Sequence, residues 1–289
     1  MNNSIIKLST LLLMSALITA CGDDGDRGPQ GPAGEQGPQG ESAAQARAID
    51  VTILHINDPH SHIPEDDFNF DVTGLALNAT NEAGDPIEDV EVIYGGFPRM
   101  VTLFNALEKQ GKNVLKLHAG DAITGTLYYS LFNGVADAAV MNQICFDAFA
   151  IGNHEFDDGD TGLANFLDAL NSTSCVTPAL SANLMTSDTS PIASRGIEPF
   201  TIVEREGEKI GIIGLTISCK TQNSSNPDDG TTFLDEATAA QANIDTLTTM
   251  GVNKIILLTH IGYANDIALA ESLTGVDVIV GGDSHSLLG

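Results

Sequence analysis

The sequence has no tryptophan, few other aromatic residues and very few basic ones. Only 12 Lys and Arg residues stand against 39 Asp and Glu residues, which gives a formal net charge of -27. Because such a field repels phosphate backbones, we expect no DNA or RNA partner. The acidic excess has two interpretations, an ordinary solvated surface or a domain that concentrates divalent cations.

Two common catalytic patterns are absent as well. The sequence contains neither a phosphate-cradling glycine loop of the P-loop type nor a Ser-His-Asp order. With aromatic residues scarce, Ala, Val, Ile, Leu and Gly must build the core, as they do in parallel α/β sheets. The 289 residues suffice for one large domain or two small ones.

Residues 1–21 are a targeting segment and not part of the fold. Lys7 precedes a short apolar run, Leu11 to Ile18, which is a poor candidate for a spanning helix. Small residues then lead to Cys21, an order that resembles the lipobox of a bacterial lipoprotein. The resemblance implies cleavage before Cys21, its acylation, and a lipid anchor on the periplasmic or surface side of a bacterial membrane. The alternative is an ordinary signal peptide.

Residues 22–49 form a stalk and linker ahead of the globular domain, 50–289. Glycine occupies every third position from Gly22 to Gly40, and proline follows several of these glycines. This is the collagen pattern. Seven triplets are few for a stable triple helix. We therefore favour a polar, extended stalk, and a trimer through a Gly-x-y helix is the alternative.

Beyond residue 50, apolar runs alternate with helical patterns, which predicts an α/β fold. The expected strands are 51–56, 113–118, 146–151, 176–182, 200–204, 209–216, 254–259 and 276–280. The expected helices are 100–110, 127–142, 161–170 and 235–250. The acidic, turn-rich stretch 63–93 is expected to be a surface insertion or a small hairpin near the mouth of a site.

Metal-type residues follow five of these strands. They are Asp58 and His60, Asp121, Asn153 and His154, His260, and Asp283 and His285. Open α/β folds keep their ligand sites at the carboxyl ends of strands. Oxygen ligands mixed with imidazoles suit a pair of divalent ions such as Mn, Zn, Mg or Fe. Two such ions clamp the attacking and leaving oxygens of a phosphoryl transfer.

Single residues in these loops suggest particular roles. Asp121 can bridge two cations with one oxygen to each. His154 can be a general acid or an electrostatic clamp, and Asp157 can hold its imidazole in one tautomer. Arg99, near the start of the helix 100–110, either meets a substrate phosphate or forms a salt bridge on the helix face.

The ordered motifs D-x-H, G-D, G-N-H-E-F-D, T-H and G-G-x-S-H resemble those of calcineurin-like metallophosphoesterases. More narrowly, they resemble the bacterial 5′-nucleotidase, UDP-sugar hydrolase and 2′,3′-cyclic phosphodiesterase family, over residues 51–289. The resemblance implies a four-layer α/β/β/α sandwich. It implies one metal on Asp58, His60 and His285, a second on Asn153, His260 and Asp283, a bridging Asp121, and a catalytic dyad of His154 and Asp157.

The implied function is hydrolysis of phosphate esters that depends on two metal ions, most specifically of 5′-nucleotides. The alternatives are a phosphodiesterase for cyclic or sugar nucleotides, and an inactive surface adhesin or binding lipoprotein. Two features depart from the family. Asp283 replaces the usual histidine, which adds negative charge and a harder ligand. The sequence also stops before the C-terminal domain that stacks the nucleobase, so either it is a fragment or base recognition is lost.

The cysteines of the globular part are Cys145, Cys175 and Cys219. In an exported protein, disulfides persist. Cys145 and Cys175 each stand eight residues before an asparagine that marks the end of a strand. If those strands are neighbours, the two cysteines stand level at the opposite edge, within disulfide reach. We predict a Cys145–Cys175 disulfide and a free Cys219, and three buried thiols are the alternative.

Overall fold

The computed structural model describes residues 47–287 except 76–78. The signal peptide with Cys21 and the Gly-x-y stalk lie outside the described residues. None of the helices in the described ranges has the length and apolar character needed to cross a membrane.

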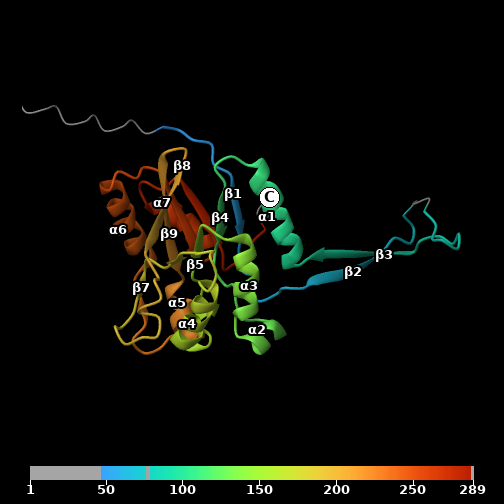
Figure 1. The fold of residues 1–289 in the computed structure, drawn as a ribbon, viewed down its shortest axis with the longest axis horizontal. Helices are drawn as coiled ribbons and strands as arrows, with labels where there is room; N and C mark the ends of the chain where they lie inside the picture. The colour runs from blue at the N-terminus through green and yellow to red at the C-terminus, as the bar shows by residue number, and fades with distance from the viewer. Residues whose placement is uncertain (1–46, 76–78, 288–289) are drawn as a thin grey trace, which may run out of the picture. The chain divides into compact units, whose positions relative to one another are not determined.

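Two four-stranded sheets form the centre of the globular part, as Figure 1 shows. The first has the order β1-β4-β5-β6 and is entirely parallel. Its strands are β1 (Ile53–Ile56), β4 (Leu115–His118), β5 (Ala148–Ala150) and β6 (Ala179–Leu180). The second has the order β12-β11-β9-β8, with only the edge strand β8 antiparallel. Its strands are β8 (Phe200–Arg205), β9 (Glu208–Thr216), β11 (Ile255–His260) and β12 (Val278–Gly281).

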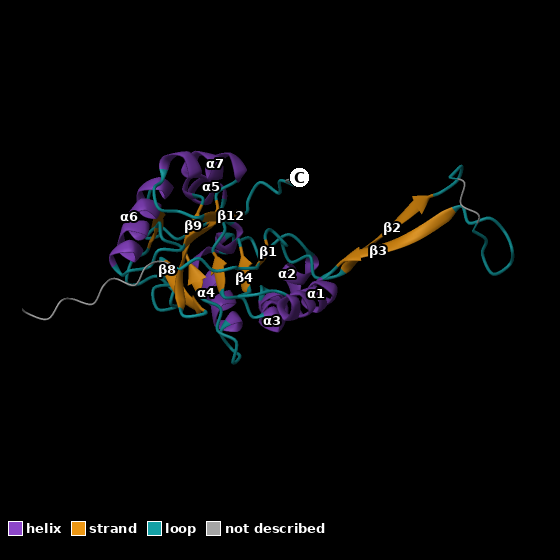
Figure 2. Ribbon diagram, turned by 90° about the horizontal axis from the view of Figure 1, so that it is seen from above, coloured by secondary structure: helices purple, strands orange, loops and turns teal. Residues whose placement is uncertain are grey.

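The two sheets pack face to face, and helices cover their outer faces (Figure 2). Helices α1 (Phe97–Gln110), α3 (Val135–Ile144) and α4 (Gly159–Leu170) cover the first sheet, while α6 (Glu236–Thr249) and α7 (Tyr263–Ser272) cover the second. Neighbouring residues of one strand point to opposite faces of its sheet and so pack into different cores. Ile212 faces the other sheet, whereas Ile213 packs against the helices. This alternation explains the continuous apolar runs of the strands and confirms the predicted four-layer α/β/β/α sandwich.

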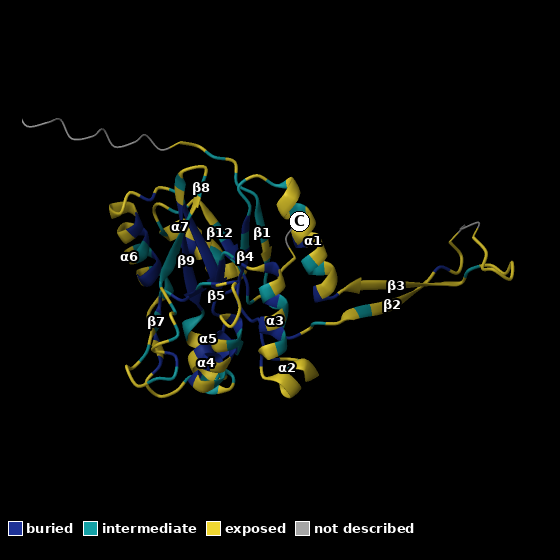
Figure 3. Cartoon of the chain, viewed as in Figure 1, coloured by how far each residue is buried: buried dark blue, intermediate teal, exposed yellow. Residues whose placement is uncertain are grey.

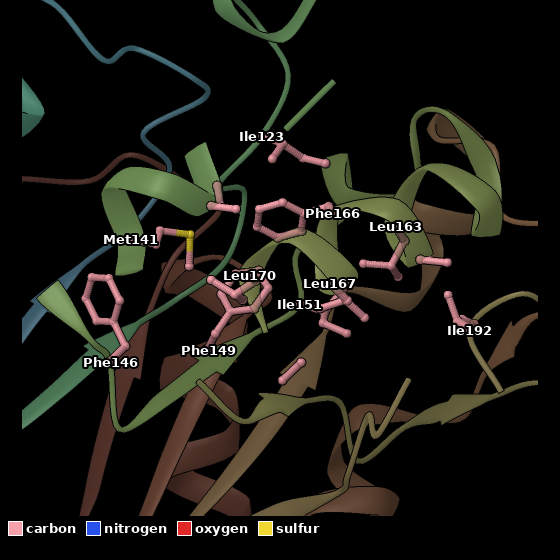
Figure 4. Packing of buried hydrophobic residues seen from close by; sticks show 14 of the residues in the cluster. Ile123, Met141, Phe146, Phe149, Ile151, Leu163, Phe166, Leu167, Leu170 and Ile192 are labelled. Atoms are coloured by element: carbon pink, nitrogen blue, oxygen red, sulfur yellow. The ribbon is translucent and has the colours of Figure 1, made fainter. Parts of the chain in front are cut away.

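The core between the first sheet and its helices contains most of the buried aromatic residues (Figure 4). Phe149 of β5 and Phe166 of α4 meet edge to face, with ring centroids 5.9 Å apart. Phe146 and Phe104 do the same at 5.8 Å. Figure 3 shows these central strands as the buried part of the chain, so the loops at the strand ends rest on a rigid base.

Several elements differ from the sequence-based expectation. The helix expected over 127–142 is two helices, α2 (Leu127–Phe132) and α3. Asn133 and Gly134 separate them with φ of 48° and 82°, a left-handed conformation that these two residue types adopt at low cost. The strand expected over 176–182 is reduced to the two residues of β6. The short elements η1 (His154–Phe156), α5 (Ser218–Ser224), α7, β7 (Leu184–Met185) and β10 (Thr232–Phe233) were not expected.

The acidic insertion forms the antiparallel hairpin of β2 (Glu65–Asp71) and β3 (Asp89–Gly95). The alternating pattern puts Phe68 opposite Val92 and Phe70 opposite Val90 on one face. In Figures 1 and 2 the hairpin projects away from the sheets, and its base is joined to the loop after β1 by the hydrogen bond between His62 and Asp66 at 2.9 Å. The expectation that it lies at the mouth of the site is therefore wrong for most of its length.

A disulfide joins Cys145 to Cys175, with Cα atoms 5.6 Å apart. Cys145 precedes β5 and Cys175 precedes β6, and these two strands are parallel neighbours. The bond therefore staples the amino-terminal edge of the first sheet, as the spacing predicts. Cys219 is exposed and free.

Candidate metal centre

Loops from both sheets meet at the carboxyl edge of the parallel strands. Asp58 follows β1, Asp121 follows β4, and His260 ends β11. Backbone hydrogen bonds hold the first two loops side by side, from Asp58 N–H to Gly120 O at 3.0 Å and from His60 N–H to Asp121 O at 3.1 Å. The structure thus brings together residues that are more than 200 positions apart in the sequence.

Asp58, His60 and His285 form the first group of converging ligand atoms. Oδ1 of Asp58 lies 3.9 Å from Nε2 of His60 and 3.3 Å from Nε2 of His285. The two imidazole nitrogens lie 3.2 Å apart. With metal–ligand bonds of about 2.0–2.2 Å, two donors on one ion are separated by roughly 3–4 Å. These three residues have that spacing.

A second group lies deeper, around the fully buried His260. Its Nε2 is 3.0 Å from Oδ2 of Asp121 and 3.8 Å from Oδ1 of Asp58. Oδ1 of Asp283 is a further 3.8 Å neighbour of the same nitrogen. Nδ1 of His260 hydrogen-bonds to Ala119 O, which fixes the ring so that Nε2 faces the carboxylates.

One buried ligand-type atom in this region, Oδ1 of Asn153, has no hydrogen-bond partner, and Nε2 of His260 faces only carboxylate oxygens. A buried polar atom left unpaired costs about 1–3 kcal/mol, so such atoms need an explanation. An amide oxygen and an imidazole nitrogen are both good ligands for divalent ions. The donor set therefore fits a metal centre at the position predicted from the sequence.

Glycines pack closely against the candidate ligand side chains and their loops. A Cβ on Gly152 would lie 2.2 Å from Oδ1 of Asp121, and one on Gly120 would lie 2.5 Å from Nδ1 of His260. A Cβ on Gly282 would meet Ala119 O at 2.4 Å. The ligand loops approach one another this closely only because these positions lack side chains.

The loops that carry the ligands hold an unusual backbone. Non-glycine residues with positive φ at this edge are Asp58, His60, Ser61, Asp121, Asp283 and His285. Left-handed conformations in such residues cost of order 1 kcal/mol or more, and they persist where surrounding structure enforces them. Backbone strain is therefore concentrated at the residues with ligand atoms.

The buried charges are strongly coupled. Burial alone would raise the pKa of Asp121, but the His260 imidazole and the His154 backbone N–H outweigh it and lower that pKa to about 2. Burial would lower the pKa of His260, yet Asp121 and Asp58 raise it to about 9. The carboxylates thus favour positive charge at the place where His260 points.

His154 and Asp157 form the pair that the sequence predicts. Nδ1 of His154 lies 2.6 Å from Oδ2 of Asp157, and this hydrogen bond raises the pKa of His154. The ring stands edge-on to His60, with centroids 4.9 Å apart. Asn226 supports the turn from outside, because its side-chain N–H₂ donates to Asp157 O at 2.8 Å.

The two carboxylate oxygens of Asp121 have different partners. Oδ1 accepts the backbone N–H of His154 at 2.9 Å. Oδ2 alone faces both imidazoles, at 3.0 Å from His260 and 3.8 Å from His60. Oδ1 is therefore engaged by a backbone hydrogen bond, and Oδ2 is the oxygen that faces the imidazoles; the bridging role of Asp121 stays a prediction.

Glu155 was missed as a functional residue, although it lies within the central motif. Its buried carboxylate accepts backbone N–H groups of Asp121 at 3.0 Å, Ala122 at 2.7 Å, and Gly152 at 2.7 Å. Burial and the charge of Asp121 raise the pKa of Glu155 to about 7. An acid directly before a buried phenylalanine is the sequence signal that points to such an inward role. Lys220 was missed too, and nothing in its surrounding sequence marks it.

Arg99 forms an ion pair with Glu65 at 2.8 Å, across the base of the hairpin. Its guanidinium also donates to Gly95 O. Among the described ion pairs and hydrogen bonds, none joins Arg99 to the converging ligand atoms. Of the two sequence-based alternatives, the structure shows the salt bridge.

The calcineurin-like phosphoesterase family matches residues 51–287, nearly the whole of the globular part. The chain belongs to this family. Calcineurin-like phosphoesterases use a dinuclear divalent metal centre, and the converging Asp and His residues lie where such a centre needs them.

Within this family, the chain is similar to proteins named 5′-nucleotidases. A probable 5′-nucleotidase of Treponema pallidum is 42% identical over 247 residues, which is 85% of this chain and 38% of the relative. An NAD 5′-nucleotidase of Haemophilus influenzae is 43% identical over 250 residues, 86% of this chain and 38% of the relative. This phosphoesterase chain thus spans about two fifths of the length of these relatives.

Solved structures agree in fold. The Haemophilus influenzae NAD nucleotidase structure superposes with a TM-score of 0.73 at 43% identity, covering 84% of this chain and 44% of that one. A 5′-nucleotidase precursor from Thermus thermophilus gives a TM-score of 0.71 at 38% identity, covering 83% and 43%.

Proposed function

We propose that this phosphoesterase hydrolyses phosphate monoesters of nucleotides, releasing a nucleoside and phosphate. The observation that carries the proposal is the convergence of Asp58, Asp121 and His260 beside the His154–Asp157 pair. Relatives named 5′-nucleotidase support this substrate class. A second proposed reaction is hydrolysis of the pyrophosphate bond of NAD to two mononucleotides, which are themselves phosphate monoesters, because the relative that is 43% identical carries the name NAD 5′-nucleotidase.

Asp58, His60 and His285 would hold one divalent ion. Asn153, His260 and Asp283 would hold the other, and Oδ2 of Asp121 would face both. When bound, such a pair of ions polarises phosphoryl oxygens, orients the ester and activates water. Both ions need a negative environment, and the buried carboxylates supply it.

His154 would act on the leaving oxygen. Its Nδ1 is engaged by Asp157, so Nε2 is the ring atom left to meet the substrate. The raised pKa of His154 favours the protonated imidazolium, which can donate a proton to, or stabilise negative charge on, the departing alkoxide. Asp157 acts through His154 by holding the tautomer.

The N-terminal sequence supports a location in the bacterial cell envelope for this activity. The lipobox-like order before Cys21 supports a lipid anchor in the bacterial envelope, and the Gly-x-y segment supports a stalk or a trimer. These are proposals from sequence. Labelling with radioactive palmitate tests the anchor. The expressed chain should incorporate the label, and its Cys21→Ser variant should not.

The central test is hydrolysis of AMP, NAD and bis-(p-nitrophenyl) phosphate by the chain with Mn²⁺ or Zn²⁺. Release of phosphate from AMP, of mononucleotides from NAD and of p-nitrophenol from the diester should stop after chelation and return when metal is restored. A His154→Ala variant with normal metal content serves as the inactive control. Undiminished turnover in excess EDTA, with no metal retained, would show the proposal to be wrong.

A further inference from the structure

Lys220 lies at the edge of the site and contacts a candidate ligand directly. Its Nζ is 2.5 Å from Oδ1 of Asp283. The other described Lys and Arg ion pairs join residues outside the converging groups, such as Arg195 with Asp168 and Lys254 with Glu208. Among the Lys and Arg residues that the structure describes, Lys220 is the one whose side chain forms an ion pair with a candidate metal ligand.

The ammonium and the second ion would compete for one atom. Oδ1 of Asp283 is the oxygen that faces Nε2 of His260 at 3.8 Å, and the same oxygen binds Lys220. Nε2 of His260 is buried, and its neighbours within 3.0–3.8 Å are the carboxylate oxygens of Asp121, Asp58 and Asp283. The separation of 3.8 Å suits two donors on one ion. An ion that joined them would meet the Lys220 charge at the shared oxygen.

Hydrogen bonds hold the backbone segments that carry both partners. The backbone N–H of Asp283 donates to both carboxylate oxygens of Asp58, at 3.2 and 3.0 Å, and its φ is 80°. Lys220 stands on α5, whose start is held by hydrogen bonds from Ser218 N–H and Oγ to Glu236, both at 2.7 Å. Ile217 N–H donates to His260 O at 2.9 Å, which ties this helix to the ligand.

We propose that Lys220 lowers the affinity of the second metal position for a divalent ion, by neutralising Asp283 and competing for its Oδ1. The inference rests on the proposed metal-binding function of the site. Paired with Lys220, the carboxylate presents almost no net charge to an ion, as a neutral imidazole would. Asp283 can therefore replace the histidine that is usual at this position without adding a full negative charge to the metal centre.

The charge balance gives the direction of the effect. A divalent ion that binds His260 and Asp283 is repelled by the nearby ammonium, and that repulsion is partly screened because Lys220 is 39% exposed. Removing the ammonium should therefore tighten binding of the second ion. Lys220 is a positioning residue in this account, and its effect must pass through Asp283.

The test titrates the metal-stripped full chain with Mn²⁺ and counts free Mn²⁺ by electron paramagnetic resonance. Lys220→Met should lower the dissociation constant of the weaker site, roughly tenfold. Lys220→Arg should keep it within about twofold, because the charge remains. The matched control is Lys209→Met, which makes the same charge change on the exposed start of β9. It should leave the constant unchanged.

Asp283→Asn provides the second arm. In that background, Lys220→Met should have no larger effect than Lys209→Met, since the carboxylate that couples the lysine to the ion is gone. An equal effect with and without Asp283 would overturn the proposal. So would a Lys220→Met titration that matches the Lys209→Met control, or a parent chain that binds fewer than two Mn²⁺ ions. Catalysis is not part of this readout: a chain that shows these shifts but hydrolyses no ester would support Lys220 and refute the phosphoesterase proposal.

Discussion

Oδ1 of Asp121 accepts the backbone N–H of His154 at 2.9 Å, while Oδ2 of the same carboxylate faces His260 at 3.0 Å. The hydrogen bond ties the loop after β4 to the loop after β5. It also positions the His154 ring beside His60 and Asp121, with the His60 and His154 ring centroids 4.9 Å apart. One carboxylate oxygen therefore positions the His154 backbone, and the other faces a candidate metal ligand.

His154→Ala and Asp121→Ala should separate catalysis from metal binding. We expect His154→Ala to lower turnover by about 10²–10³-fold with metal content unchanged, because only a proton donor and charge stabiliser is lost. Asp121→Ala should lose both ions. Elemental analysis alongside turnover measures this. A metal-free His154→Ala protein beside a fully loaded Asp121→Ala protein would mean that the roles are reversed.

Glu155→Gln should weaken both folding and metal binding. The carboxylate accepts several backbone N–H groups, whereas an amide has one acceptor oxygen and turns its own N–H₂ toward donors. We expect a loss of about 2–3 kcal/mol in the free energy of unfolding, together with weaker Mn²⁺ binding. Denaturant unfolding measures the first. The exposed Glu204→Gln is the control, and equal stability of the two variants would contradict the positioning role.

Asp137 should make stability depend on pH. Its carboxyl is buried with both oxygens unpaired, and burial raises its pKa from 3.8 to about 6. The folded state therefore keeps the proton that the unfolded chain releases. Its contribution to the free energy of unfolding is greatest below pH 4 and is lost as the pH rises to about 6. The loss is roughly 3 kcal/mol at most, at about 1.4 kcal/mol per pKa unit.

Asp137→Asn removes this titration. The variant should exceed the parent chain in stability at pH 7.5 and lose that advantage near pH 4. Chemical denaturation at both pH values tests it, with the exposed Asp245→Asn as the matched control. A constant difference between Asp137→Asn and the parent across this range would count against the raised pKa.

Arg99→Met should leave the Michaelis constant for AMP within about twofold, because an exposed ion pair with Glu65 contributes at most about 1 kcal/mol and lies away from the ligands. Arg195→Met, which breaks another exposed pair, is the control. Steady-state kinetics measures both. A tenfold rise in the constant for Arg99→Met alone would restore the phosphate-binding interpretation.

The Cys145–Cys175 bond should appear as the only disulfide among the three cysteines of the described residues in non-reducing peptide mapping, with Cys219 alkylated without reductant. The bond closes a loop of 30 residues, for which the chain-entropy model expects about 3–4 kcal/mol. The Cys145→Ser/Cys175→Ser double variant should lose a comparable amount of stability. A crosslinked peptide that contains Cys219 would contradict the pairing.

Much of the site could be predicted because its residues mark themselves locally. An acid, an amide or a histidine directly after a buried apolar strand is conspicuous, and parallel strands bring their carboxyl ends to one edge. The same logic placed Cys145 level with Cys175 at the other edge. The helix break at Asn133 was also present in the sequence as Asn-Gly, but a helical apolar pattern on both sides concealed it.

The sequence by itself determined the strand ends and the kinds of ligand they carry, because these follow from periodicity and residue type over short stretches. The four-layer class came from the resemblance of its ordered motifs to a known family. Only the tertiary structure decided that Asp121 turns one oxygen to the His154 backbone and the other to His260, and that the Glu155 carboxylate holds the loops together. It likewise decided that Arg99 pairs with Glu65 and that Lys220 binds Asp283. Each of these depends on the approach of loops or strands distant in the sequence to within a few ångströms. A pattern along the chain contains no measure of that approach, because it is set by the packing of two sheets and the close contacts that Gly152 and Gly282 permit.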